Sequence, residues 1–244
     1  MSRASSRLHS IVRQMSASAS QSSTSSSSLT KLKQFSACEL SDALIKLGVP
    51  HGGHIPDVRR VTSYEGSVEE RICGPAYTVK MVHASDKEAP KPEKHFVDTV
   101  VDGSVVVIDA PPDVKNAVWG GLMTAGASSR GALGLVISGR CRDLLEHNSM
   151  RFPIFSRGTS TLGQSPFTRP SAVQVPVTIS PQYFNQPQNA ENGYVFPAVT
   201  VNPGDFITAD IDGVVCVPKD LVDEVVKVAE KGREVDANIE RNRL

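Results

Sequence analysis

The chain has 244 residues, with 26 lysines and arginines balanced by 26 aspartates and glutamates. This length suits one domain with a substantial core, and the zero net charge gives no overall field toward nucleic acid or anionic lipid, so we expect neither as a partner. No apolar run approaches the roughly twenty residues that cross a bilayer. The four cysteines form no CxxC pair, which argues against a zinc knuckle and a secreted disulfide framework.

Residues 1–30 differ in composition from the rest of the chain. Serine and alanine dominate, arginines are spaced along the segment, and no acidic residue precedes Glu39. This composition is typical of a mitochondrial transit peptide followed by a disordered serine linker. A disordered tail on a cytoplasmic protein is the alternative. We predict one domain over residues 31–232 and a charged C-terminal end over residues 233–244, which is either a solvated helix end or an arm on a neighbouring subunit.

The ordered part begins with a helix. Ser36 and Glu39 make a capping box, apolar residues then recur at helical spacing, and Gly48 ends the pattern. Further helices are predicted after residue 120, over 142–150 and from residue 219, and the polar stretches 85–94 and 182–192 are predicted as loops. Strands are predicted over residues 72–82, 104–110, 133–138, 153–156, 173–179, 195–201 and 206–218, the last broken by a turn around Asp212 and Gly213. This mixture predicts an α/β fold.

The most informative stretch, residues 119–143, reads WGGLMTAGASSRGALGLVISGRCRD. Two adjacent glycines inside a helix cost about 1 kcal/mol each, so we expect irregular chain up to Gly120 and a helix from Gly121 to about Arg130. The free amides of Gly121, Leu122 and Met123 would then make an anion site at the helix N-terminus. Glycine also lets a ligand approach the backbone closely.

Arg142 and Asp143 follow the next predicted strand. That strand ends in a tight turn at Gly139, which brings both side chains to the carboxyl edge of the sheet, where open α/β sheets bind ligands. Arginine offers a charged fork to a carboxylate or enolate oxygen, and aspartate is a hard oxygen ligand for Mg²⁺ or Mn²⁺. The pair predicts a site for an anionic, oxygen-rich substrate; an ordinary helix cap with a surface charge is the alternative.

Four blocks of sequence, GPAYTV, WGGLMTAGASSRGALGLVISGRCRD, FPIFSRGTST and VNPGDFITADIDGVVCVP, occur here in the order seen in the regulator of ribonuclease activity A (RraA) family. That family includes 4-hydroxy-4-methyl-2-oxoglutarate aldolases, and the chain resembles it over residues 36–228. The resemblance implies an α/β fold with a layered β-sheet sandwich flanked by helices, of the swivelling β/β/α type. It also implies a homotrimer or hexamer with sites between subunits.

The resemblance further implies roles for individual residues. Asp143 matches the aspartate that ligates the metal, and Arg142 matches the arginine that contacts the substrate and steadies the enolate. The backbone loop that receives the substrate carboxylate is matched by Gly120, Gly121, Leu122 and Met123.

The function that follows is a class II, metal-dependent aldolase that cleaves 4-hydroxy-2-oxo acids to pyruvate, with oxaloacetate decarboxylase activity because both reactions generate the same enolate. No lysine lies between Gly120 and Asp143, which disfavours a Schiff-base aldolase. One alternative is a non-catalytic, RraA-like binding protein with a regulatory role. Methyl transfer from S-adenosylmethionine ranks last, because it needs a glycine-rich loop directly after an early strand.

Other polar residues receive structural interpretations. Asp109 and Asp113 border the glycine loop. Contact with the outer water shell of a metal is an alternative role for both. The remaining interpretations are a turn at Asp210, Asp212 and Gly213, a polar loop with His51, His54 and Asp57, a packing anchor at Trp119 and a buried, space-filling Cys141.

Overall fold

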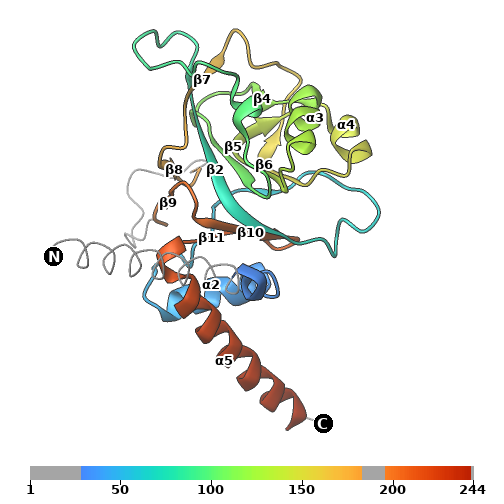
Figure 1. The fold of residues 1–244 in the computed structure, drawn as a ribbon, viewed down its shortest axis with the longest axis vertical. Coiled ribbons are helices and arrows are strands. Elements are labelled where there is room, and N and C mark those ends of the chain that lie inside the picture. The colour runs from blue at the N-terminus through green and yellow to red at the C-terminus, as the bar shows by residue number, and fades with distance from the viewer. Residues whose placement is uncertain (1–28, 183–195, 243–244) are drawn as a thin grey trace, which may run out of the picture.

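The computed structural model describes residues 29–182 and 196–242. Residues 1–28 of the predicted tail and residues 183–192 of the predicted polar loop therefore lie outside the described residues. Figure 1 shows a twisted mixed sheet with two short helices, α3 and α4, on one side of its upper part. Two further helices, α2 and α5, lie below it, and α5 projects away from the body of the molecule.

The helices are bounded close to the residues that the sequence predicts. They are α2 (Ala37–Lys46), α3 (Gly121–Ser129), α4 (Leu144–Ser149) and α5 (Val222–Arg241), with the 3-10 helices η1 (Phe96–Thr99) and η2 (Lys219–Leu221). The strands are β1 (Arg59–Arg60), β2 (Ile72–His83), β3 (Val105–Asp109), β4 (Ala117–Trp119), β5 (Gly134–Cys141), β6 (Ile154–Thr159), β7 (Thr168–Val173), β8 (Val177–Ile179), β9 (Val199–Val201), β10 (Phe206–Asp210) and β11 (Gly213–Val217).

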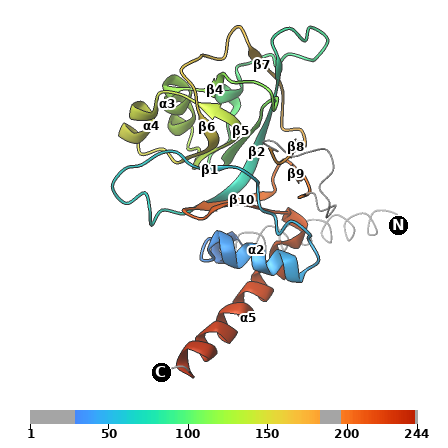
Figure 2. The same cartoon turned by 180° about the vertical axis from the view of Figure 1, so that it is seen from behind.

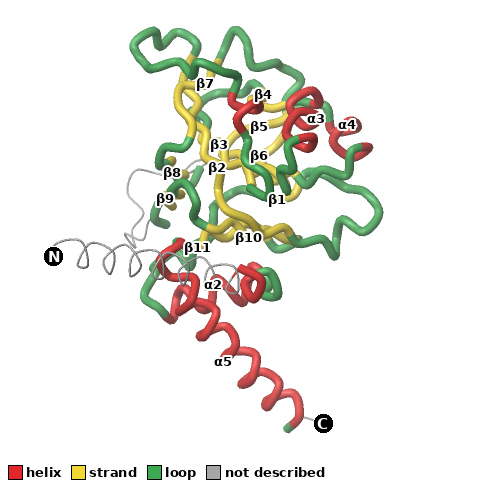
Figure 3. The backbone as a smooth tube through the Cα atoms, viewed as in Figure 1, coloured by secondary structure: helices red, strands yellow, loops and turns green. Residues whose placement is uncertain are grey.

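The main sheet has a parallel centre and antiparallel ends. Its order is β1-β6-β5-β3-β2-β10-β11, with β4 added to β5 and β7 added to β2. Strands β2, β3, β5 and β6 pair in parallel, whereas β10 runs antiparallel to both β2 and β11. The two end strands, β1 and β11, lie against each other, so the sheet nearly closes on itself (Figures 2 and 3). Together with the small β8–β9 sheet, this arrangement confirms the predicted α/β class of sheet layers flanked by helices.

The core falls into three clusters of buried side chains. One, which includes Phe96 and Trp119, lies on the side of the parallel strands that α3 and α4 cover. A second fills the space between the parallel strands, the β10–β11 hairpin and the β8–β9 pair. A third, with Leu40 and Val225, holds α2 and α5 against that hairpin. The central strand β3 is buried on both faces, which explains its unbroken run of valine and isoleucine.

Local sequence signals proved accurate where they depended on neighbouring residues. Ser36 and Glu39 form the predicted capping box of α2, and the turn at Asp212–Gly213 joins β10 to β11. The predicted turn at Gly139 is wrong, because β5 continues through that residue to Cys141. A Cβ at Gly139 would lie 2.9 Å from the Cβ of Ala110, so glycine lets neighbouring backbones pack closely there.

Three further differences concern strands and the C-terminal end. The strand predicted over 173–179 is two strands, β7 and β8, separated by a turn, and the sequence analysis did not predict β1 or β4. Helix α5 continues beyond residue 232, so the charged end is helical as far as Arg241. Within the described ranges, the helices are too short or too polar to cross a membrane.

Candidate functional site

The turn between β5 and α4 presents Arg142 and Asp143. Asp143 has φ 64° and ψ 45°, a left-handed conformation that aspartate tolerates better than most side chains. The Arg142 amide donates to the Trp119 carbonyl at 3.0 Å, and the Asp143 carbonyl accepts from the amides of Glu146 and His147 at 3.1 and 3.2 Å. The backbone therefore fixes both side chains at the carboxyl end of β5, as predicted, but through this turn and not through Gly139.

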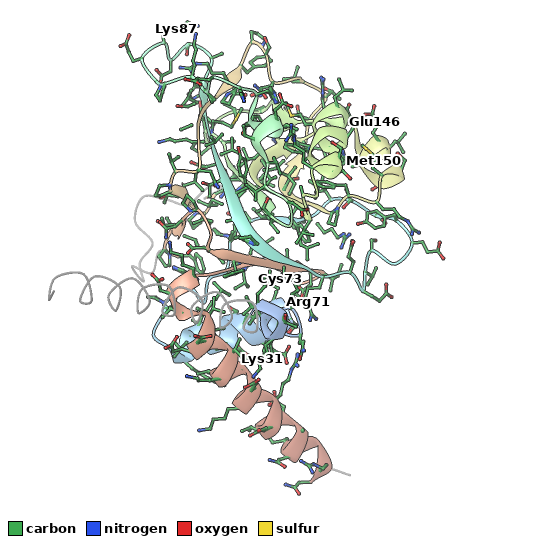
Figure 4. The ribbon with its side chains drawn as sticks, viewed as in Figure 1. Lys31, Arg71, Cys73, Lys87, Glu146 and Met150 are labelled. Atoms are coloured by element: carbon green, nitrogen blue, oxygen red, sulfur yellow. The ribbon has the colours of Figure 1, made fainter. Side chains whose placement is uncertain are left out.

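The glycine pair leaves space for two carboxylates. A Cβ at Gly120 would lie 2.6 Å from Oδ2 of Asp143, and a Cβ at Gly121 would lie 1.5 Å from Oε2 of Glu146. Gly120 itself has an extended backbone that any residue adopts, so space and not conformation requires glycine there. Figure 4 shows Glu146 beside α3. The sequence suggested that these glycines let a ligand approach the backbone. In the structure, the side chains of Asp143 and Glu146 also occupy the space where a Cβ would lie.

The start of α3 differs from the predicted set of three free amides. Asp143 Oδ2 accepts a hydrogen bond from the Gly121 amide at 2.9 Å, and the Met123 amide donates to the Gly120 carbonyl at 3.0 Å. Among the described residues, only the Leu122 amide of these three lacks a partner. Asp143, which directly precedes α4, already binds the Gly121 amide. The anion site at this helix therefore offers the Leu122 amide, supported by the helix dipole.

One cavity joins these groups. Its volume is about 420 Å³, and all six predicted site residues line it: Gly120, Gly121, Leu122, Met123, Arg142 and Asp143. Glu146 and Gln164 line it as well. Arg142 Nε lies 3.5 Å from Asp143 Oδ2, and the Arg142 side chain is 46% exposed, so the cavity opens to solvent. The arrangement places one guanidinium, two carboxylates and a helix N-terminus around a space that a small organic acid can fill.

A chain of buried polar groups lies directly behind the cavity. Trp119 Nε1 donates to Thr124 Oγ1 at 2.7 Å, and Thr124 Oγ1 lies 3.0 Å from His147 Nδ1. All three side chains are at most 1% exposed. Burial lowers the pKa of His147, an effect that the Arg142 backbone and the carboxylates of Asp143 and Glu146 partly oppose. Burial therefore favours the neutral imidazole.

The two carboxylates of the cavity could contribute to a site for a divalent metal. The described residues give Asp143 Oδ1 and the Glu146 carboxylate no hydrogen-bond partner, and within those residues no group of three or more His, Cys, Asp or Glu side chains could hold a metal. A preformed zinc cage is thus absent from the described part of the chain. Mg²⁺ commonly binds through one or two carboxylates together with substrate oxygens and water. The donor set fits such an ion, and Asp143 would hold it.

Comparison with known proteins places the chain in a family. Residues 37–216 match the family model for RraA-like proteins, described as Aldolase/RraA. The chain belongs to the RraA-like family. Relatives with curated names include DlpA of Legionella pneumophila, 31% identical over 199 residues, a match that covers 81% of this chain but only 28% of DlpA. A protein of Halalkalibacterium halodurans named "Putative 4-hydroxy-4-methyl-2-oxoglutarate aldolase" is 30% identical over 172 residues, covering 70% of this chain and 71% of that protein.

Solved structures support the RraA-like fold. An uncharacterized protein from Pseudomonas syringae pv. tomato superposes with a TM-score of 0.69 at 29% identity, covering 88% of this chain and 91% of the other. RraAS2 of Streptomyces coelicolor, described as an unusual member of the RNase ES inhibitor RraA protein family, gives a TM-score of 0.70 at 22% identity, covering 88% and 96%. The second likeness concerns the fold alone.

The residues that received structural interpretations lie outside the lining of this cavity, apart from Trp119, which lines it and is otherwise buried. Asp109 accepts a hydrogen bond from Ser138 at 3.0 Å, and Asp113 lies 3.2 Å from His83, so both are engaged elsewhere. The cavity also does not include the ADIDG turn, the loop with His51 and His54, or Cys141. Burial raises the pKa of the Cys141 thiol, which agrees with a space-filling role.

Three residues at or behind the cavity were not predicted from the sequence: Glu146, Gln164 and His147. A signal existed for Glu146, because it stands three residues after Asp143 at the start of a helix and so shares a face with it. His147 also shares that turn, but its hydrogen-bond partner Thr124 belongs to another helix. Gln164 lies in a loop beyond β6, where sequence spacing gives no indication of its position.

Proposed function

We propose that this RraA-like protein is a divalent-metal-dependent lyase that cleaves 4-hydroxy-2-oxo acids, of the 4-hydroxy-4-methyl-2-oxoglutarate type, to pyruvate. Decarboxylation of oxaloacetate is the proposed side activity. The observation that supports this most directly is the convergence of Arg142, Asp143 and the N-terminus of α3 on one cavity. A small 2-oxo acid needs such a combination, because its carboxylate and developing enolate are both anionic.

The proposed reaction breaks the bond between C3 and C4 of the substrate. A base removes the proton of the C4 hydroxyl, the C3–C4 bond breaks, and its electron pair passes to the 2-oxo group as pyruvate enolate, which is then protonated at C3. When bound, a divalent cation would stabilise the enolate charge. Arg142 would contact the developing oxyanion more strongly than the ground-state carbonyl, while the Leu122 amide would orient the substrate carboxylate. From oxaloacetate, loss of carbon dioxide leaves the same enolate.

Glu146 is assigned the proton transfer in this proposal. Its carboxylate lies in the cavity against Gly121 and has no hydrogen-bond partner among the described residues. Asp143 is less suited to this role, because its Oδ2 already accepts from the Gly121 amide. A carboxylate with free oxygens can take the hydroxyl proton and return it to the enolate carbon. The two acidic residues therefore have separate tasks.

The proposed assembly is a homotrimer or hexamer. Leu122 is 90% exposed and Leu145 is 85% exposed, and both lie on the helices that flank the cavity. Two large apolar side chains beside a polar site are typical of a surface that another subunit covers. Light scattering after gel filtration tests this, and a monomeric mass at micromolar concentration would contradict it.

The experiment for the lyase proposal measures pyruvate release from 4-hydroxy-4-methyl-2-oxoglutarate and from oxaloacetate, with Mg²⁺ and with EDTA. We expect turnover in Mg²⁺ only. Asp143→Asn retains an oxygen that can cap α3 and a residue that tolerates the left-handed conformation, but it removes the charge for the metal. We expect this variant to lose roughly a hundredfold or more in kcat.

Asp113→Asn is the matched control, because it removes an exposed carboxylate that does not line the cavity. It is expected to retain wild-type turnover. Absence of pyruvate release by the wild-type protein on either substrate would contradict the lyase proposal and favour the non-catalytic binding role. Equal losses in both variants would contradict the assignment of Asp143.

A further inference from the structure

The polar chain behind the cavity has an unusual place in the core. Trp119 belongs to the apolar core cluster with Phe96, and Thr124 and His147, which follow it in the hydrogen-bonded chain, are fully buried. Apolar residues of similar size would fill this space without hydrogen-bonding groups to satisfy. Buried polar groups instead require defined partners, so they favour one arrangement of the segments that bear them.

The chemistry of the three side chains determines which group donates and which accepts in each hydrogen bond. An indole N–H only donates, so Thr124 Oγ1 is the acceptor in its 2.7 Å contact with Trp119. The hydroxyl hydrogen of Thr124 is then free to donate to His147 Nδ1 at 3.0 Å. Within the described residues, His147 Nε2 is buried and has no partner with good hydrogen-bond geometry, although the imidazole also interacts with the Arg142 backbone. The contact with Thr124 is therefore the side-chain hydrogen bond that orients the imidazole.

Each member belongs to a different segment of the site. Trp119 ends β4, and its carbonyl accepts from the Arg142 amide at 3.0 Å. Thr124 lies in the first turn of α3, where its amide donates to the Gly120 carbonyl at 3.2 Å. His147 lies in α4, and its amide donates to the Asp143 carbonyl at 3.2 Å. One hydroxyl thus joins the segments that present the glycine pair and the Arg142–Asp143 turn.

We propose that the Trp119–Thr124–His147 chain positions the N-terminus of α3 against the turn that bears Arg142 and Asp143. The three are positioning residues for the proposed lyase reaction, on which this inference rests. The 2.9 Å hydrogen bond from the Gly121 amide to Asp143 depends on this position of α3 relative to the turn. Loss of the hydroxyl allows α3 and α4 to shift relative to each other, which displaces Asp143 from the free Leu122 amide.

The test compares Thr124→Val, which removes the hydroxyl at nearly constant volume, with Thr124→Ser, which retains it. Thr78→Val is the matched control, because Thr78 is equally buried and its hydroxyl donates to the Val175 carbonyl at 2.6 Å, away from the cavity. For each variant we measure kcat and KM for pyruvate release, the Kd of oxalate in Mg²⁺, the Tm, and amide hydrogen exchange over residues 119–124 and 142–147.

Thr124→Val is expected to lower kcat by roughly ten- to a hundredfold, since a small misplacement of reacting groups has effects of that size. It should also weaken oxalate binding and accelerate exchange in both segments. Thr124→Ser should remain within about twofold of wild type in kcat. Thr78→Val should lower Tm as much as Thr124→Val does while retaining kcat and oxalate affinity.

Two results would overturn the positioning role: wild-type kcat in Thr124→Val, or an equal loss of kcat in Thr78→Val, which would mean that general destabilisation is the cause. If the wild-type protein releases no pyruvate, the lyase proposal fails, and hydrogen exchange alone decides the inference. Faster exchange over both segments in Thr124→Val but not in Thr124→Ser supports it, and unchanged exchange contradicts it.

Discussion

Helices α2 and α3 differ in whether their own segment supplies a side-chain cap. In α2, Ser36 and Glu39 satisfy each other's backbone amides, and the Ala37 amide also donates to Asp210 Oδ2 at 2.8 Å. The N-terminus of α3 has Gly120 at the capping position and no side-chain cap from its own segment. In the described part of the chain, its first amide is satisfied by Asp143 alone, which belongs to a turn 22 residues later in the chain.

This difference separates the region that supports the fold from the region that we propose binds substrate. Around α2, the capping side chains are paired, and Arg233 of α5 also pairs with Glu39. Around α3, Asp143 is left-handed, Leu122 is exposed and His147 Nε2 is unpaired. Departures from ordinary local preferences gather at functional sites, because the rest of the fold holds them in place.

Arg142→Lys tests the α3 region with the largest expected effect. Lysine retains the charge but lacks the planar fork, so it cannot make paired contacts to an enolate oxygen and a carboxylate. We expect kcat and kcat/KM to fall together by roughly a hundredfold. Steady-state kinetics in saturating Mg²⁺ measures this, and a rise in KM with unchanged kcat would show that Arg142 binds the ground state only.

The two glycines provide a sharper comparison within the same region. Gly120→Ala directs a methyl group at Asp143, whose backbone is fixed, whereas Gly121→Ala directs one at the flexible end of Glu146. We expect Gly120→Ala to weaken oxalate binding in Mg²⁺ by roughly tenfold or more. Gly121→Ala should lower kcat with a smaller change in oxalate affinity, because it displaces the proposed proton carrier. Calorimetry and kinetics on both variants check this, and identical effects would contradict the separate tasks of the two carboxylates.

Glu39→Gln tests the α2 region and has the smallest expected effect. The side-chain hydrogen bond from Arg233 lowers the pKa of Glu39 from 4.5 to about 2. Since the folded-state pKa lies below the unfolded value, this stabilisation is present above pH 4.5 and is lost as the pH falls toward 2. The variant should be less stable than wild type by about 1 kcal/mol or less at pH 7, because the pair is partly exposed.

Denaturant unfolding at several pH values measures that difference, which should shrink below pH 4.5. The kcat for pyruvate release should not change. A loss of kcat in Glu39→Gln that matches the loss in the α3 variants would remove the distinction between the two regions.

The sequence predicted what nearby residues determine. The capping box at Ser36, the start of α3 at Gly121 and the hairpin turn at Asp212 are all set within a few residues, and the structure confirms them. The strand β4 was missed, because three residues have no detectable periodicity and their pairing partner in β5 is distant in the sequence. Gly139 was misread for the same reason, since its close neighbour Ala110 lies on another segment.

The sequence predicted that the residues of the site come together, but not how they contact one another. Arg142, Asp143 and the glycine pair were identified, and they line one cavity. The capture of the Gly121 amide by Asp143 could not be deduced, because it depends on how α3 and α4 lie against each other. The same packing places Thr124 against His147, a contact between two helices that no spacing within either one predicts.

The most direct test of the account is a crystal structure with Mg²⁺ and oxalate, a planar mimic of pyruvate enolate. We predict the cation on the carboxylate of Asp143 and the oxalate between the Arg142 guanidinium and the Leu122 amide. Oxalate and Mg²⁺ bound elsewhere on the molecule, with the cavity still empty at saturating concentrations of both, would contradict it.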